Sequence, residues 1–249
     1  MKLSIVIPAH NEGSCIEKTI LKILLLIRKE NIDFEILVVN DKSEDSTEVV
    51  LQHLSSDYPE VRYINNSYPK GYGFAVRKGL ENYLGDVVAI IMADGSEDPR
   101  DVVKFFRKLE KGYDCIFGSR FIKGGKAYNY PVFKLILNRL SNLFICTVFA
   151  IKYNDTTNAF KMYRRETIEG LKPFLSHHFN LTIELPLKAI TRDYSYAVLP
   201  NTWTGRKTGE SKFKIKEMGS RYLFIVIYCL IEKWLSVGDY KKNSQIQKK

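Results

Sequence analysis

The first half of the chain alternates short continuous apolar runs with longer stretches whose apolar residues recur every three or four positions. The apolar runs predict strands at 3–8, 34–41, 61–65, 86–94 and 114–120. The amphipathic stretches predict helices at 12–28, from about 43–46, at 73–83 and from Pro99. Strands that are apolar on both faces, alternating with helices, indicate a mostly parallel sheet covered on both sides.

The second half is less regular. It predicts helices at 131–152, 180–191 and 220–238, strands at 158–166 and 196–203, and a basic loop at 205–216. The apolar runs in the first and last of these helices are shorter than the roughly 20 residues of a membrane span. We expect residues 1–240 to form one α/β domain with halves at 1–120 and 121–240. Residues 241–249 are expected to be a disordered basic tail.

Polar side chains stand where the predicted strands end. They are Asn11 and Glu12, Asn40 and Asp41, Asp94, and Ser119 and Arg120. In parallel sheets ligands bind beyond the carboxyl ends of the strands, so these side chains are expected to line one crevice. Around Asp94, a cluster of carboxylates repels itself unless a metal ion, a basic side chain or water lies among it.

Composition and charge narrow the class of protein. The 249 residues are 45% apolar and 27% charged, which is typical of a globular protein. Of the net charge of +10, residues 201–249 supply 11 − 4 = +7, which favours phosphate-bearing partners. The four cysteines form no C-x-x-C pair, which argues against a disulfide framework or zinc site and for a reducing compartment. The N-terminus is too short for a signal peptide and predicts a first strand.

Six segments carry a resemblance to a known family. They are "SIVIPAHNE", "ILVVNDKSEDST", "GYGFAVRKG", "MADGSEDP", "IFGSRF" and "GRKTGESKF". In this order and spacing the chain resembles inverting family 2 glycosyltransferases, and within them dolichyl- and polyprenyl-phosphate hexosyltransferases, over about residues 3–235. The resemblance implies a glycosyltransferase-A, Rossmann-like fold. Residues 1–120 would bind the nucleotide sugar and 121–240 the acceptor.

The resemblance also implies donor-binding residues. Pro8, His10 and Glu12 would border the nucleoside, and Asp41 would accept hydrogen bonds from base or ribose. Glu12 and Asp41 each precede a predicted helix, so helix capping is the alternative. Gly71, in the glycine-containing segment, would lie beside the donor.

A divalent metal ion, Mg²⁺ or Mn²⁺, is implied as the cofactor. Asp94 matches the second acid of the family's D-x-D motif, but Met92 replaces the first acid. Ser96 falls where the polyprenyl enzymes often have glutamine and is a candidate second ligand. Glu97 and Asp98 are alternatively residues that lead or cap the helix from Pro99.

Several basic residues are expected to contact phosphate. Arg120, Arg206 and Lys212 match family residues that grip the diphosphate or the acceptor phosphate, which arginine meets bidentately. Gly205 and Gly209 would let the basic loop close as a lid, and an ordinary surface loop is the alternative. Arg164 or Arg165 is expected to meet a phosphate near the acceptor.

The acceptor stays open between two classes. A polyprenyl phosphate, taking mannose or glucose at the cytoplasmic face of a membrane, needs no base because it is already anionic. The helices at 131–151 and 220–235 would supply apolar surface for peripheral membrane contact, and packing in the core or in a homodimer is the alternative. A glycan or small hydroxyl acceptor would use Glu184 as base. A third hypothesis, suggested by Met92, is a nucleotide-sugar-binding protein without turnover. No nucleic-acid partner is expected.

Overall fold

The computed structural model describes residues 1–205 and 215–242, with the side chains of 215–218 left out. The strands are β1 (Leu3–Ala9), β2 (Phe34–Asn40), β3 (Val61–Asn65), β4 (Val87–Ile90), β5 (Cys115–Ser119), β6 (Lys126–Tyr128), β7 (Lys161–Arg164), β8 (Tyr196–Pro200) and β9 (Thr202–Thr204). The helices are α1 (Ile16–Lys29), α2 (Thr47–Asp57), α3 (Tyr72–Asn82), α4 (Pro99–Leu109), α5 (Val132–Phe149), α6 (Arg165–Gly170), α7 (Leu181–Thr191) and α8 (Ile215–Leu235).

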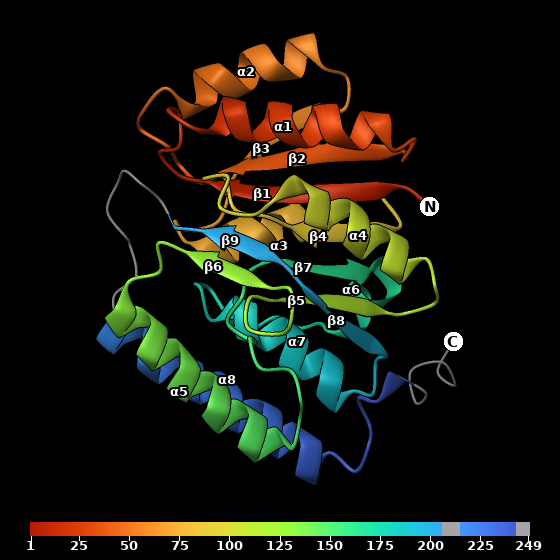
Figure 1. The fold of residues 1–249 in the computed structure, drawn as a ribbon, viewed down its shortest axis with the longest axis vertical. Coiled ribbons are helices and arrows are strands. Elements are labelled where there is room, and N and C mark those ends of the chain that lie inside the picture. The colour runs from red at the N-terminus through yellow and green to blue at the C-terminus, as the bar shows by residue number, and fades with distance from the viewer. Residues whose placement is uncertain (206–214, 243–249) are drawn as a thin grey trace.

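A seven-stranded sheet forms the centre of the molecule, in the order β3-β2-β1-β4-β7-β5-β8 (Figure 1). Its pairs are parallel except for those of β7, which runs antiparallel to both β4 and β5. The inner strands β1 and β2 are buried along their whole length, as their continuous apolar runs require. The predicted mostly parallel sheet is therefore confirmed. The predicted boundary between halves at residue 120 stays a prediction.

Helices cover both faces of the sheet. One apolar core joins α1, α2 and α4 to residues such as Ile5 and Ile7 of β1. A second core joins α3, α6 and α7 to the opposite face, where Val6 of the same strand points. A third cluster packs α5 and α8 side by side against α7, so these two helices form an outer layer (Figure 1).

A small second sheet changes the prediction for the end of the chain. The expected strand 196–203 divides at Asn201 into β8, which belongs to the large sheet, and β9, which pairs with β6. Trp203 of β9 also forms an antiparallel bridge with Glu97. The sequence predicted neither β6 nor α6. β6 is short and largely exposed, so it has no apolar run to reveal it.

The outer layer leaves much of its apolar surface uncovered. One stripe on each helix is about half exposed or more, and we call these two stripes the apolar platform. They are Val132, Phe133, Ile136, Leu140, Leu143 and Phe144 on α5, and Leu223, Phe224, Ile227, Ile231, Trp234 and Leu235 on α8. By length and composition alone α5 is long and apolar enough to span a membrane, whereas its short apolar run predicted that it was too short. Large exposed apolar patches on globular proteins mark interaction surfaces, and the apolar platform is a candidate for one.

Candidate active site

The ends of β1 and β2 meet at the carboxyl edge of the sheet, as predicted. The His10 Nδ1 atom lies 2.8 Å from the backbone oxygen of Asp41, and the Glu12 backbone N–H donates to Thr47 Oγ1. The Glu12 carboxylate is buried and accepts a hydrogen bond from Cys15 Sγ at 3.2 Å. Pro8 is the last but one residue of β1, on the same edge.

The carboxylate of Asp41 links two loops and does not cap a helix. Its Oδ1 accepts from Asn66 Nδ2 at 2.7 Å and its Oδ2 from the Gly71 backbone N–H at 2.9 Å. The start of α2 is instead held by Asp45, which accepts from the Thr47 N–H. The capping alternative for Asp41 is therefore wrong. The carboxylate is fixed at the carboxyl edge of the sheet, where its remaining lone pairs suit hydroxyl or N–H donors of a ligand.

Gly71 is required by close packing. A Cβ atom there would lie 2.9 Å from the backbone oxygen of His177, below the distance that such atoms tolerate. The residue stands at the N-terminus of α3 and gives its N–H to Asp41. The glycine thus lets the loop after β3 approach the His177 segment while it positions Asp41.

The loop after β4 folds back on itself. The Ser96 N–H donates to Asp94 Oδ1 at 3.0 Å, and Glu97 Oε2 accepts from the Met92 N–H at 3.2 Å and from Ser96 Oγ at 3.1 Å. Because Met92 turns its N–H to this side chain, β4 ends at Ile90 and not at 94 as predicted. Asp98 accepts from the Arg100 N–H and caps α4, which confirms its predicted role.

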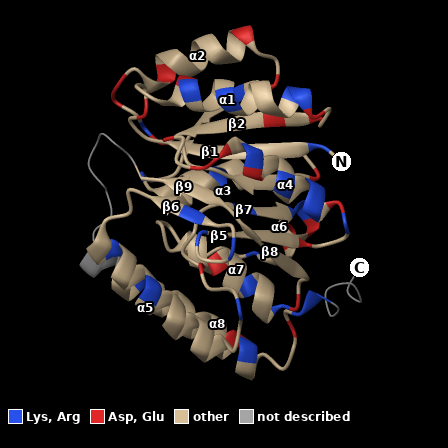
Figure 2. Cartoon of the chain, in the orientation of Figure 1, with Lys and Arg blue, Asp and Glu red and all other residues tan. Residues whose placement is uncertain are grey.

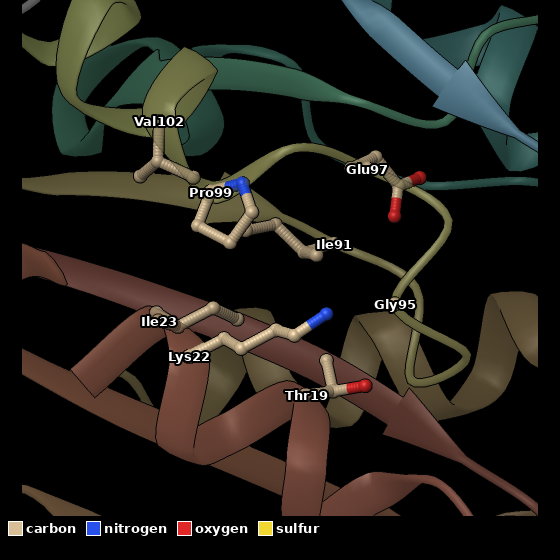
Figure 3. Close-up of a pocket in the computed structure, with 8 residues that line it drawn as sticks. All are labelled: Thr19, Lys22, Ile23, Ile91, Gly95, Glu97, Pro99 and Val102. Atoms are coloured by element: carbon tan, nitrogen blue, oxygen red, sulfur yellow. The ribbon is translucent and has the colours of Figure 1, made fainter. Parts of the chain in front are cut away.

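Glu97 is the functional candidate that the sequence reasoning understated. Burial, and after it the nearby charge of Asp94, raises the pKa of Glu97 to about 8. Figure 3 shows its carboxylate hanging from the 95–99 loop beside a cavity of about 30 Å³, which Thr19 and Lys22 of α1 line from the other side. A cavity of that volume has room for about one water molecule and none for a nucleotide. The carboxyl edge of the sheet is therefore the better candidate for a ligand site.

The residues of this loop fit a divalent cation that is coordinated partly by protein oxygens and partly by phosphate oxygens. Within residues 1–205 and 215–242, no three His, Cys, Asp or Glu side chains form a metal-binding group. Asp94 and Glu97 interact electrostatically, however, and Mg²⁺ sites commonly use only one or two carboxylates, completed by phosphate oxygens and water. The predicted ligand role of Asp94 is compatible with this geometry, as is that of Ser96. Both stay predictions.

Arg120 lies in a buried ion pair. Its Nε and Nη2 donate to Asp155 at 2.8 and 2.7 Å, and its guanidinium faces the rings of Tyr130 and Trp203. Burial would lower the pKa of Arg120, but the carboxylate of Asp155 outweighs it and raises the pKa. Nε and Nη2 are committed to Asp155, and the guanidinium also hydrogen-bonds Tyr130. The predicted contact between Arg120 and a phosphate stays a prediction.

Lys161 completes this buried cluster. Its ammonium donates to the backbone oxygens of Thr156 and Asn158, which follow Asp155 in the chain. Burial lowers the pKa of Lys161 to about 7, although the charge of Asp155 opposes the shift. Lys161 and Asp155 were not singled out from sequence. A lysine in the predicted strand 158–166 was the available signal.

The expectation for Arg164 is wrong. β7 runs antiparallel to β4, and Arg164 pairs with Val87 at the start of that strand. The guanidinium donates to the backbone oxygens of Tyr113 and Leu109, at the edge opposite the crevice. Arg165 likewise binds the backbone oxygens of Tyr83 and Gly85. Both arginines anchor loops at the amino edge of the sheet.

The structure also excludes Glu184 as a base. Glu184 and Lys188 are both 0% exposed and form an ion pair of 2.6 Å within α7. The same carboxylate accepts the backbone N–H groups of Leu175 and Ser176, each at 2.7 Å. A sugar hydroxyl has no access to it, so Glu184 holds the 173–176 loop. The predicted basic loop, with Arg206 and Lys212, lies outside the described residues, as does most of the 241–249 tail.

Comparison with known proteins agrees with the resemblance. A dolichol-phosphate mannosyltransferase of Pyrococcus furiosus is 33% identical over 223 residues, which are 87% of this chain and 60% of that protein. The chain thus spans about 60% of that relative's length. A polyprenol monophosphomannose synthase of Mycolicibacterium smegmatis is 29% identical over 202 residues, 75% of this chain and 76% of the relative.

Solved structures share the fold. The glucosyl-3-phosphoglycerate synthase of Mycobacterium tuberculosis, in complex with Mn²⁺, uridine diphosphate and glucosyl-3-phosphoglycerate, superposes with a TM-score of 0.68. The match covers 93% of this chain and 79% of the other at 19% identity, which shows a glycosyltransferase-A type fold. The family model for glycosyl transferase family 2 matches residues 4–171. The chain therefore belongs to glycosyl transferase family 2.

Proposed function

We propose that the protein transfers a hexose, mannose or glucose, from a nucleotide-diphosphate sugar to a polyprenyl phosphate at a membrane surface. The named relatives act on dolichol or polyprenol phosphates and support this choice. The observation that carries it is the connection between the crevice and the apolar platform. α5 starts shortly after β6, whose partner β9 bridges Glu97 through Trp203.

In this proposal the donor lies along the carboxyl edge of the sheet. Pro8, His10 and Glu12 border the nucleoside, and Asp41, held by Asn66 and Gly71, orients base or ribose. Asp94 and the loop after it hold Mg²⁺ or Mn²⁺, which when bound neutralises charge on the departing nucleoside diphosphate. The Mn²⁺ and uridine diphosphate in the mycobacterial structure support a metal-assisted donor site.

The acceptor supplies its own nucleophile. A phosphate monoester with a second pKa of about 6 is largely dianionic at pH 7, so no side chain has to remove a proton. Its oxyanion attacks the anomeric carbon opposite the diphosphate and inverts the configuration there. Arg120 and the sequence neighbours Arg206 and Lys212 are proposed to hold the phosphates. The burial of Glu184 supports an acceptor that needs no base.

The apolar platform is proposed to lie on the bilayer as a peripheral contact, on its cytoplasmic face. Figure 2 shows α5 mainly in tan, with Lys and Arg at intervals along it. Lys134 and Arg139 on α5 and Arg221 and Lys233 on α8 accompany the platform. Apolar burial combines there with roughly 1 kcal/mol for each Lys or Arg near anionic lipid. A second copy of the chain is the competing occupant.

The test is transfer of labelled sugar from a panel of nucleotide sugars to a short-chain polyprenyl phosphate. We expect lipid-extractable product with a β linkage from an α-linked donor, and none from the corresponding polyprenol without phosphate. Transfer to a soluble hydroxyl acceptor but not to the lipid would contradict the proposal. Donor binding with no product from any acceptor would favour a nucleotide-sugar-binding protein without turnover.

A further inference from the structure

We propose that Glu97 replaces the missing first acid of the metal motif and, with Asp94, supplies the carboxylate ligands for the divalent cation. The inference rests on the proposed donor site. In the family pattern the first acid stands two residues before Asp94, where this chain has Met92. Glu97, five residues after Met92 in the chain, places its carboxylate beside Met92.

The hydrogen bonds of the loop show this placement. Glu97 Oε2 accepts the Met92 N–H at 3.2 Å, so the carboxylate lies against the backbone of the residue that lost its acid. The Ser96 hydroxyl donates to the same oxygen at 3.1 Å. Both described hydrogen bonds of the side chain fall on Oε2.

The backbone is built to hold the side chain there. Gly95 has a φ of +66°, a left-handed backbone conformation that residues other than glycine rarely adopt. A Cβ atom at this position would also lie 2.9 Å from Thr19 Oγ1. After the turn, Glu97 is clamped by its bridge to Trp203 of β9. The reversal therefore comes from the sequence of the loop and from its contacts on two sides.

The electrostatics call for a cation. Glu97 is 6% exposed, and the charge that acts on it is that of Asp94, another acid. Lys22 reaches into the neighbouring cavity (Figure 3), but the described residues include no ion pair between it and Glu97. Helix capping does not account for Glu97 either, because Asp98 caps α4. Two neighbouring acids that repel each other, the buried Glu97 and the partly exposed Asp94, are stabilised when a divalent cation binds both.

The test measures Mn²⁺ binding directly, by the loss of the electron paramagnetic resonance signal of free Mn²⁺, with GDP or UDP present. Glu97→Gln keeps the size and the acceptor oxygen for the Met92 N–H but removes the charge. We expect it to weaken Mn²⁺ binding at least tenfold without lowering the melting temperature. Asp98→Asn is the matched control, adjacent in sequence and acidic, and is expected to bind Mn²⁺ like the wild type.

A second variant tests the exchange of positions. Met92→Asp combined with Glu97→Gln restores an acid at the family position, and we expect it to recover most of the lost Mn²⁺ affinity. Should Glu97→Gln fail to fold, Glu97→Asp, which retracts the carboxylate by one methylene, is expected to weaken binding in its place. Wild-type Mn²⁺ affinity in Glu97→Gln, or in Glu97→Asp, would overturn the inference. That result would leave the proposed function standing, because sugar transfer to polyprenyl phosphate is measured separately.

Discussion

Replacing Glu184 with glutamine is expected to destabilise the fold and to leave sugar transfer per folded molecule nearly unchanged. The carboxylate accepts hydrogen bonds from Leu175 N, Ser176 N and Lys188 Nζ at 2.7, 2.7 and 2.6 Å. Glutamine has the same shape, but it removes the counter-charge of a fully buried ammonium. Its amide group also turns two donor hydrogens toward groups that are themselves donors.

The size of the effect follows from the burial of the pair. Removing one partner of a buried ion pair costs about 3–5 kcal/mol, because the other charge stays buried. For a chain of this length each kcal/mol lowers the melting temperature by about 2–4 °C, so the expected loss is about 6–20 °C. The matched control is Glu169→Gln, which breaks an ion pair of 2.7 Å with Lys172 that is roughly half exposed. Exposed pairs contribute about 0–1 kcal/mol, so its melting temperature is expected to stay within a few degrees of the wild type.

The assay combines thermal unfolding by circular dichroism with transfer measured well below both melting temperatures. The reasoning predicts a lower melting temperature for Glu184→Gln and near-normal transfer by the fraction that is folded. If this variant melts with the wild type and loses about two to four decades of transfer, Glu184 is a general base after all. The acceptor would then be a hydroxyl compound.

Four further outcomes are expected. Asp94→Asn should lower transfer by about two decades or more without unfolding the chain, and EDTA should mimic it; unchanged turnover in both would remove the metal role. Arg164→Ala should lower stability but leave the donor KM unchanged, since the residue lies at the opposite edge of the sheet; a raised KM would contradict this placement. Phe224→Asp should weaken co-sedimentation with anionic vesicles, whereas Leu25→Asp, equally exposed at 59% on α1, should not; equal binding by both variants would contradict a bilayer contact. The pKa of Lys161 falls from 10.5 to about 7 on folding, so between these pH values the unfolded chain binds more protons than the folded one. As pH rises through this range, the stability of the wild type relative to Lys161→Met should therefore increase, by up to about 1.4 kcal/mol per pH unit. If the urea midpoints of the two proteins depend on pH in parallel, the pKa of the lysine is not perturbed.

The crevice itself was predictable from local sequence. Continuous apolar runs identify buried parallel strands, and the carboxyl ends of parallel strands share one edge, so Asp41 and Asp94 lie at the same edge of the sheet. Asp98 before Pro99 predicted a helix cap, and the structure has one. These predictions succeed because each depends on strand or helix periodicity and on nothing beyond the residue's own segment.

Tertiary structure alone decided the roles of Arg164, Glu184 and Glu97. Arg164 lies at the far edge because β7 inserts antiparallel between β4 and β5, and no apolar pattern records the direction of a strand. Glu184 stands in an amphipathic sequence, yet segments distant in the chain bury its carboxylate. Lys188, four residues later, neutralises the charge of that carboxylate. The sequence predicted that Glu97 leads a helix, whereas in the structure the loop folds its carboxylate back against the Met92 N–H. Periodicity reports which side of a segment is apolar, whereas the partner of a charge is set by the packing of segments that only the folded chain brings together.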